Sequence, residues 1–281
     1  MLKKLINLNQ RNVLFKKINN LKIKSSGVDN EGDPFVELKN GIKFYGGKNK
    51  ANTDKLLYNL LNKNSKNVLN FNCVQTALDI VIRYVEGGLK YGGPKKQSRY
   101  NVKEGDIVSE MGAYQGFCSL KLAQQVGATG KVIAIEPMPD NFRLLKKNKI
   151  ANNLDQLEIV NKGVWDISKT LVFNRKIGDG QSSSIEMDYT GGEKIEVSAD
   201  TLDQIYKEVG VDNLDFIIIQ LNGAEINALR GLTSFKPLNM SIAARYDTES
   251  VDAAVAIKDL LKQREYKSEI VESDFVFSKL V

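Results

Sequence analysis

The chain has 281 residues, of which 42% are hydrophobic, and this length suits one large domain or one domain with an appendage. It contains two cysteines and no histidine, which excludes Ser-His-Asp and Cys-His nucleophiles and argues against a disulfide framework or a structural zinc site. The net charge of +6 is uneven, because residues 1–100 carry 19 basic and 7 acidic side chains and residues 101–281 carry 21 and 27.

Residues 1–100 predict a basic region of helices and one hairpin, and residues 101–281 predict a separate domain. Apolar residues at helical spacing predict an amphipathic helix over residues 1–25, and Ser26-Gly27 predicts a turn after it. An Asn-Gly turn between two short apolar runs predicts the hairpin. The elements expected after the first helix are strands at 35–38 and 42–45 and helices at 56–61 and 73–85.

The positive charge of residues 1–100 allows two interpretations. It suits a solvated lysine-rich surface, or a cap or platform for a polyanion such as nucleic acid or a phosphorylated glycan. No apolar run of about 18 residues predicts a transmembrane helix, and the first residues lack the apolar core of a secretory signal. A reducing cytoplasm is the expected compartment, and no pattern in the sequence indicates an oligomeric state.

From residue 105 onward, strands and helices alternate regularly. This order predicts an α/β fold with a Rossmann-like, mostly parallel sheet of seven strands, helices on both faces and an antiparallel pair at the C-terminal end. The expected strands are 107–111, 132–136, 157–161, 170–173, 195–198, 216–221, 240–245, 269–271 and 275–277, and the expected helices are 115–127, 139–152, 200–209, 224–232 and 250–264.

The most informative stretch is an apolar run that ends in Glu110 and is followed by Gly112 and Gly116. Glycines here let the backbone turn tightly and approach a ligand, and the following helix offers its unpaired N–H groups. The next apolar run ends in Glu136, where an acid can accept hydrogen bonds from both ribose hydroxyls. The third glycine of a dinucleotide fingerprint is missing, which favours S-adenosylmethionine, a nucleoside without a pyrophosphate, over NAD.

Four stretches, at residues 105–116, 135–142, 198–203 and 214–225, occur in an order that resembles the FkbM family of S-adenosylmethionine-dependent methyltransferases. The resemblance covers roughly residues 100–232, and the antiparallel strand pair is typical of class I methyltransferases. It implies S-adenosylmethionine as the cofactor and methyl transfer, usually to a hydroxyl of a sugar, polyketide or similar small acceptor.

By that resemblance, the two glycines lie against the methionine end of the cofactor, with Glu110 nearby. Glu136 holds the ribose, and Asn161 and Asp166 are candidates for the adenine side, although Asp166 is equally suited to a plain turn. The full expected cofactor-binding set is Glu110, Gly112, Ala113, Tyr114, Gly116, Glu136, Pro137, Asn161 and Asp166.

The chain departs from the family at the acceptor side. The family pattern reads approximately Lys-Ile-Asp-Val-Glu-Gly-Ala-Glu, and residues 218–225 read Ile-Ile-Gln-Leu-Asn-Gly-Ala-Glu. Gln220 and Asn222 are amides, which orient a substrate but cannot take its proton. Glu225 is the remaining candidate base, or an acid that only stabilises the helix it begins. The expected catalytic residues are therefore Glu225, Gln220 and Asn222.

Three functions follow from these patterns. The favoured function is O-methylation of a sugar or other small hydroxylated acceptor. The second is methylation of RNA or DNA held by the basic residues 1–100. The third is a catalytically weakened protein that binds the cofactor. The loop at 178–194 and the segment Arg245-Tyr246-Asp247 are candidates for contacts to the acceptor.

Overall fold

The computed structural model describes residues 23–47, 76, 80, 99–175, 183–184, 193–244, 252–271 and 275–281. The helix expected at 56–61 and the segment at 245–247 lie outside these residues, as does most of the loop at 178–194. Thr76 and Ile80 are helical and buried, within the helix expected at 73–85.

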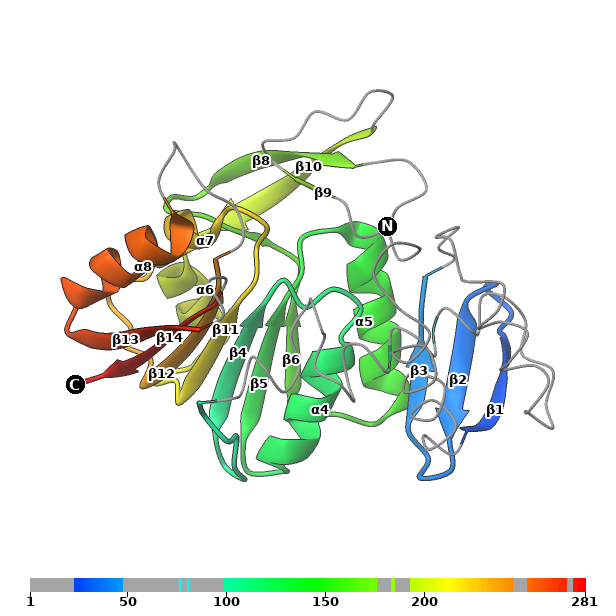
Figure 1. Cartoon of the computed structure of the whole chain (residues 1–281). Helices are drawn as coiled ribbons and strands as arrows, with labels where there is room; N and C mark the ends of the chain where they lie inside the picture. Colours follow the sequence, from blue (N-terminus) through cyan, green and yellow to red (C-terminus); the bar gives the residue numbers. More distant parts are fainter. Residues whose placement is uncertain are drawn as a thin grey trace, which may run out of the picture.

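Seven strands form the main sheet, in the order β13-β14-β12-β11-β4-β5-β6 (Figure 1). The five strands from β12 to β6 in this order run parallel, whereas β14 runs antiparallel to both β12 and β13. The predicted seven-stranded sheet with its C-terminal antiparallel pair is therefore confirmed. Its strands are β4 (Ile107–Met111), β5 (Lys131–Ile135), β6 (Leu157–Val160), β11 (Phe216–Ile219), β12 (Asn239–Ala243), β13 (Tyr266–Val271) and β14 (Phe275–Leu280).

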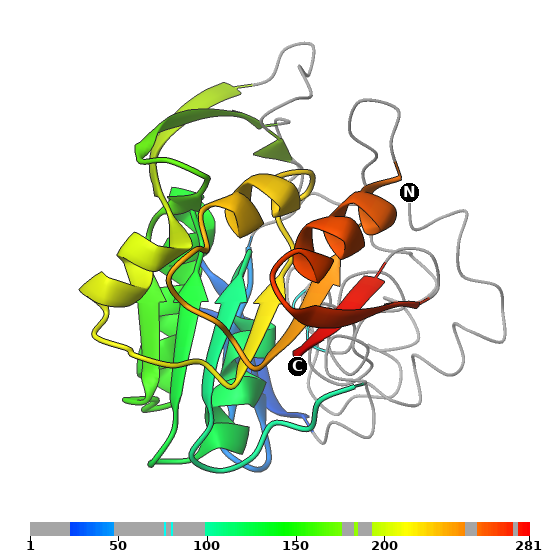
Figure 2. The same ribbon diagram turned by 90° about the vertical axis from the view of Figure 1, so that its left-hand side faces the viewer.

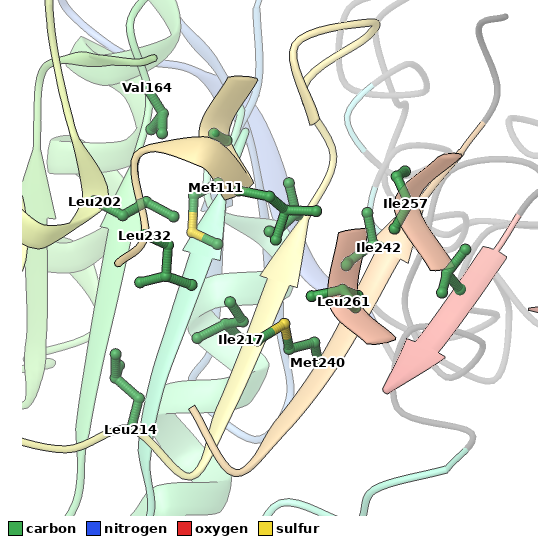
Figure 3. Close-up of a cluster of buried hydrophobic side chains, with 14 of the residues drawn as sticks. Met111, Val164, Leu202, Leu214, Ile217, Leu232, Met240, Ile242, Ile257 and Leu261 are labelled. Atoms are coloured by element: carbon green, nitrogen blue, oxygen red, sulfur yellow. The ribbon is translucent and has the colours of Figure 1, made fainter. Parts of the chain in front are cut away.

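Helices cover both faces of the main sheet, as Figures 1 and 2 show. The central strand β11 is apolar on both sides, as expected of a parallel strand between two helical layers. Phe216 and Ile218 belong to the core under α4 and α5, while Ile217 and Ile219 belong to the opposite core (Figure 3). No described helix is long and apolar enough to cross a membrane. The helices are α4 (Phe117–Val126) and α5 (Pro139–Ala151) on one face and α6 (Leu202–Glu208), α7 (Glu225–Arg230) and α8 (Ala253–Lys262) on the other.

A second sheet has the order β7-β10-β8-β9 and stands over the carboxyl ends of the main strands (Figures 1 and 2). The strands expected at 170–173 and 195–198 are confirmed as parts of β8 and β10, which pair antiparallel. The structure places these two strands in a sheet separate from the main one. The sequence did not predict this, because it indicates where strands lie but not which distant strands pair. The members are β7 (Gly163–Val164), β8 (Lys169–Arg175), β9 (Ser183–Ser184) and β10 (Glu193–Asp200).

The N-terminal sheet consists of β1 (Ile23–Val28), β2 (Pro34–Leu38) and β3 (Lys43–Tyr45), and it confirms the predicted hairpin. The helix expected at 1–25 is wrong at residues 23–25, which lie in β1, and its residues 1–22 lie outside the described part of the chain. The turn expected at Ser26-Gly27 is also wrong, because both residues lie in β1. Gly27 packs against the Phe35 ring, since a Cβ there would lie 3.1 Å from Phe35 Cε1. This glycine therefore marks a close approach within a strand and not a turn.

Ion pairs join the N-terminal sheet to α5. Arg143 donates to both oxygens of the buried Asp33 carboxylate at 2.5 and 2.7 Å. Lys147 Nζ contacts Asp33 and Glu31 at 2.8 Å each and also pairs with Asp29. Burial tends to raise the pKa of Asp33, but these two cations outweigh it and hold the pKa below its usual value. The three neighbouring carboxylates thus form a docking contact with a lysine at their centre.

A buried carboxylate clamps the connection from α7 to β12. Asp203 accepts hydrogen bonds from Thr233 N, Thr233 Oγ1, Ser234 N and Phe235 N at 2.7 to 3.3 Å. Burial tends to raise the pKa of Asp203, but these donors overcome it and lower the pKa from 3.8. This acid closes the sequence stretch 198–203, so the structure gives that motif a structural role.

We expect Asp203→Ala to lower the free energy of unfolding by about 3 kcal/mol, because four donors lose a charged acceptor. The contribution of Asp203 is present above the pKa of the unfolded chain and is lost as the pH falls through the lower folded pKa. Urea unfolding at neutral pH and at acid pH below 3.8 measures both effects. An equal difference between wild type and variant at both pH values would contradict the assignment.

Candidate functional site

The chain order of the main sheet reverses between β4 and β11. From β4 the chain continues through β5 and β6 on one side, whereas β11 and β12 extend the sheet on the other. Met111 and Ile219 are paired neighbours at the carboxyl ends of these two strands. The following segments, residues 112–116 (the cofactor loop) and residues 220–224 (the acceptor loop), therefore begin side by side. Ligands of open α/β sheets bind at this reversal point.

Both loops have an unusual backbone. Gly112, Tyr114 and Gly116 have φ values of 77°, 56° and 85° in the cofactor loop, and Asn222 and Gly223 have 53° and 111° in the acceptor loop. Only four non-glycine residues in the described part of the chain have a positive φ, and two of them lie here. Left-handed backbone at non-glycine residues concentrates where the surrounding structure enforces it, often at ligand sites.

The two glycines of the cofactor loop are required by packing as well as by backbone angle. A Cβ at Gly112 would lie 2.1 Å from the carbonyl oxygen of Gln220, so the two loops touch there. A Cβ at Gly116 would lie 2.4 Å from Leu145 Cδ1 on α5. The predicted contact of both glycines with the cofactor stays a prediction beside this packing role.

Glu136 lies directly after β5 and is buried. Its carboxylate accepts hydrogen bonds from Tyr114 N at 2.8 Å, Met138 N at 3.1 Å and Asn141 Nδ2 at 3.2 Å. Asn161 Nδ2 donates to the carbonyl oxygens of Glu136 and Pro137 at 2.8 and 3.1 Å. The structure thus brings together the acid predicted to hold the ribose, the cofactor loop and the amide after β6.

Of the remaining expected cofactor residues, Glu110 and Ala113 lie at and just after the end of β4, whereas Asp166 lies near the end of α7. Glu110 is buried at the end of β4 and accepts a hydrogen bond of 2.6 Å from Ser119 Oγ on α4. Ala113 is buried, and its N–H donates to the Ile135 carbonyl at 3.0 Å. Asp166 instead packs its backbone near Gly231, at the end of α7, and has no hydrogen bond to Glu136 or Asn161.

Glu225 is buried and holds the acceptor loop. Its two carboxylate oxygens accept hydrogen bonds from Leu221 N at 2.7 Å and Gly223 N at 2.9 Å. Burial raises the pKa of Glu225, and the hydrogen bonds from the backbone oppose this only in part. These contacts favour the interpretation of Glu225 as an acid that stabilises the loop and the helix start, and its role as a base stays a prediction.

Gln220, the first residue of the acceptor loop, has a buried side-chain oxygen for which the described residues provide no donor. The backbone N–H of Gln220 donates to the Met111 carbonyl at 3.2 Å, which fixes the backbone at the end of β11. Its side-chain Oε1 is buried and receives no hydrogen bond from the described residues. Asn222 is exposed, and its left-handed backbone turns the chain toward α7. A buried acceptor without a donor is rare in proteins, so Gln220 Oε1 calls for an explanation.

Sequence reasoning missed Gln115 and Asn148. Asn148 lies on α5 with no exposed surface and donates to the carbonyl of Gln115, a residue of the cofactor loop, at 2.8 Å. Its amide also exchanges hydrogen bonds with the backbone of Tyr45 on β3. The signal available in the sequence is an asparagine repeated four residues later on the same helix face, at Asn152.

Comparisons with known proteins gave one family match and several similar solved structures. A sequence model of the FkbM methyltransferase domain matches residues 110–268, and curated proteins gave no match. Similar solved structures include a SAM-dependent methyltransferase from Aquifex aeolicus, with 16% identity, a TM-score of 0.41 and coverage of 66% of this chain and 88% of that one. Aeropyrum pernix fibrillarin with natively bound S-adenosyl-L-methionine has 13% identity, a TM-score of 0.42 and coverage of 93% and 100%. A SAM-dependent O-methyltransferase from Thermotoga maritima has 15% identity, a TM-score of 0.39 and coverage of 67% and 66%.

The domain match confirms the resemblance of this chain to the FkbM family. It includes the cofactor loop, Glu136 and the acceptor loop, and it extends through α8 into β13. Because it spans more than half of the chain, the protein belongs to the FkbM family of S-adenosylmethionine-dependent methyltransferases.

Proposed function

We propose that this methyltransferase transfers the methyl group of S-adenosylmethionine to a hydroxyl of a small acceptor, such as a sugar. The observation that carries the proposal is Gln220, whose buried Oε1 has no donor among the described residues at the reversal point of the main sheet. An amide oxygen only accepts hydrogen bonds, so its ligand partner must be a donor such as O–H. The acceptor loop is therefore suited to orienting a hydroxyl.

The residues of the cofactor loop and of the β5 end fit the cofactor. We assign Glu136, after β5, to the ribose hydroxyls, since a carboxylate accepts from both. The tight backbone of Gly112 lets the methionine end approach the carboxyl ends of β4 and β11. When bound, the cofactor supplies an electrophilic methyl group, so alignment of the acceptor oxygen contributes much of the rate acceleration.

In the proposed reaction, Gln220 Oε1 accepts a hydrogen bond from the acceptor hydroxyl and turns an oxygen lone pair toward the methyl group. When bound, the cofactor would supply the methyl group, whose bond to the acceptor oxygen would form as its bond to sulfur breaks, and Gln220 would hold that oxygen in place. The hydroxyl proton leaves to water, because a carboxamide does not hold it. Glu225 acts by holding the acceptor loop through Leu221 and Gly223.

The described part of the basic region favours a small acceptor over nucleic acid. Residues 23–47, which form the N-terminal sheet, carry three lysines and four acidic residues. Three of those acids, at positions 29, 31 and 33, pair with Lys147 of α5. This sheet therefore offers no excess of positive charge to a phosphate backbone.

Binding and transfer assays test the proposed function. Calorimetric titration with S-adenosylmethionine and S-adenosylhomocysteine tests the cofactor site first. Methyl-labelled cofactor is then incubated with neutral sugars, sugar phosphates and RNA in parallel. Label on a sugar hydroxyl supports the proposal, whereas transfer to RNA with salt-dependent affinity replaces it with the nucleic-acid function.

Gln220→Met separates a ligand role from a structural one. Because Oε1 has no partner, its replacement by a similar apolar side chain should leave the melting temperature unchanged or raise it. The KM for the acceptor should rise about tenfold, as expected for one lost hydrogen bond. Thermal melting and initial-rate kinetics measure the two effects.

The control variant is Gln156→Met. The Gln156 amide donates to the Ala123 carbonyl at 2.8 Å, away from both loops. This change should lower the melting temperature and leave the KM for the acceptor unaltered. Loss of cofactor affinity in Gln220→Met, with an unchanged KM for the acceptor, would assign Gln220 to the methyl donor instead.

A further inference from the structure

Asn148 of α5 and Asn152, the C-cap of this helix, cover the edge of the N-terminal sheet. Asn148 accepts from Tyr45 N at 2.6 Å and donates to Tyr45 O at 3.0 Å. Asn152 repeats the pattern with Lys43, accepting from its N–H at 2.9 Å and donating to its carbonyl at 2.7 Å. Residues four apart on a helix thus meet residues two apart on β3, and each side-chain amide replaces one residue of a neighbouring strand.

The two asparagines differ in one contact. Asn148 also donates to the Gln115 carbonyl at 2.8 Å, whereas the second bond that Asn152 donates goes to the Asn148 carbonyl within α5. A second link runs alongside, because Gly47 N, just after β3, donates to Gln115 Oε1 at 3.2 Å. Gln115 is itself buried; the link from Asn148 is buried as well, and the link from Gly47 is partly buried.

Gln115 is the point at which such an anchor has the greatest effect on the cofactor loop. It lies between Tyr114 and Gly116, both of which have a positive φ. A tyrosine holds this left-handed conformation only where surrounding contacts fix the neighbouring peptide groups. Tyr114 N is also the group that donates to Glu136, so a shift of the Gln115 peptide would move the carboxylate assigned to the ribose.

We propose that Asn148 is a positioning residue for the cofactor loop and makes the affinity for the methyl donor depend on the docking of the N-terminal sheet against α5. The inference rests on the proposed cofactor site at residues 112–116 and Glu136. The N-terminal sheet is then part of the cofactor-binding unit and not a separate cap. Because linkage is reciprocal, cofactor binding should in turn stabilise the docking of β3.

The test compares Asn148→Ala with Asn152→Ala in the full chain. Both changes remove one asparagine–strand pairing, and both should lower the melting temperature. Only Asn148→Ala should weaken S-adenosylhomocysteine binding, by about tenfold, measured by calorimetry below the melting temperature of all variants. Hydrogen exchange of the cofactor loop without ligand should accelerate in Asn148→Ala and match wild type in Asn152→Ala.

Three outcomes overturn the proposal: equal S-adenosylhomocysteine affinities in the two variants, a loss confined to Asn152→Ala, or unchanged exchange of the cofactor loop in Asn148→Ala. If Asn148→Ala does not fold, Gln115→Met removes the link from Gly47 alone, and a smaller loss of affinity in the same direction is expected. If wild type binds no S-adenosylhomocysteine, the proposed function fails, and the ligand-free exchange comparison still decides whether Asn148 positions the loop.

Discussion

Gly112→Ala is expected to lower the free energy of unfolding by about 3–5 kcal/mol, because the new Cβ combines overpacking with a left-handed backbone. The methyl group would lie 2.1 Å from the Gln220 carbonyl oxygen, which belongs to a backbone fixed by its bond to Met111. Neither loop can yield without breaking the contact between β4 and β11. Denaturant unfolding followed by circular dichroism measures the loss.

Gly210→Ala is the matched control for this prediction. Gly210 has a φ of 65°, but no atom lies within 4 Å of the position that its Cβ would take. Its replacement should therefore show the backbone effect alone, about 1–2 kcal/mol. Equal destabilisation by Gly112→Ala and Gly210→Ala would show that the close contact between the two loops does not exist in solution.

Glu136→Gln is expected to weaken S-adenosylhomocysteine binding by about 100-fold, because bonds to a charged acceptor are roughly twice as strong as neutral ones. The amide would keep one oxygen, but its NH2 group would face N–H donors such as Tyr114 N or Met138 N. The variant would thus lose both the expected ribose contact and part of the support of the cofactor loop. Calorimetric titration at fixed salt measures the change.

The control for this variant is Glu196→Gln, a loss of one carboxylate at an exposed position of β10. It should bind S-adenosylhomocysteine like wild type. Should Glu136→Gln also bind like wild type, the assignment of the ribose to the end of β5 is wrong, and the contacts of Glu136 serve the loops alone.

Local patterns were sufficient to predict the order of the main sheet's elements. The run Phe-Ile-Ile-Ile of β11 is short, rich in β-branched residues and apolar on both sides, which is typical of a buried parallel strand. The position of Glu136 at the end of a strand was also predictable, because the apolar run before it marks where the strand stops. The family resemblance, confirmed by the domain match, then supplied the reaction.

Features that depend on distant contacts were not predictable in this way. Ser26-Gly27 has the composition of a turn, and only the Phe35 ring beneath Gly27 explains a strand there. Asn148 has the pattern of a solvated helix position, and its burial depends on β3 and Gln115, which lie 103 and 33 residues away. Glu225 matched a catalytic position of the family, while its contacts are with its own loop.

The position of β14 has a consequence for how the molecule is made. This strand lies between β12 and β13, although it follows both in the chain. During synthesis, it leaves the ribosome after every other strand of the main sheet, so β12 and β13 have no partner at this edge until it inserts. Unpaired strand edges recruit other chains. The last strand of this sheet to be synthesised is therefore an interior one. A nascent chain that stalls before residue 275 exposes unpaired edges of β12 and β13, which can pair with other chains translated from the same mRNA.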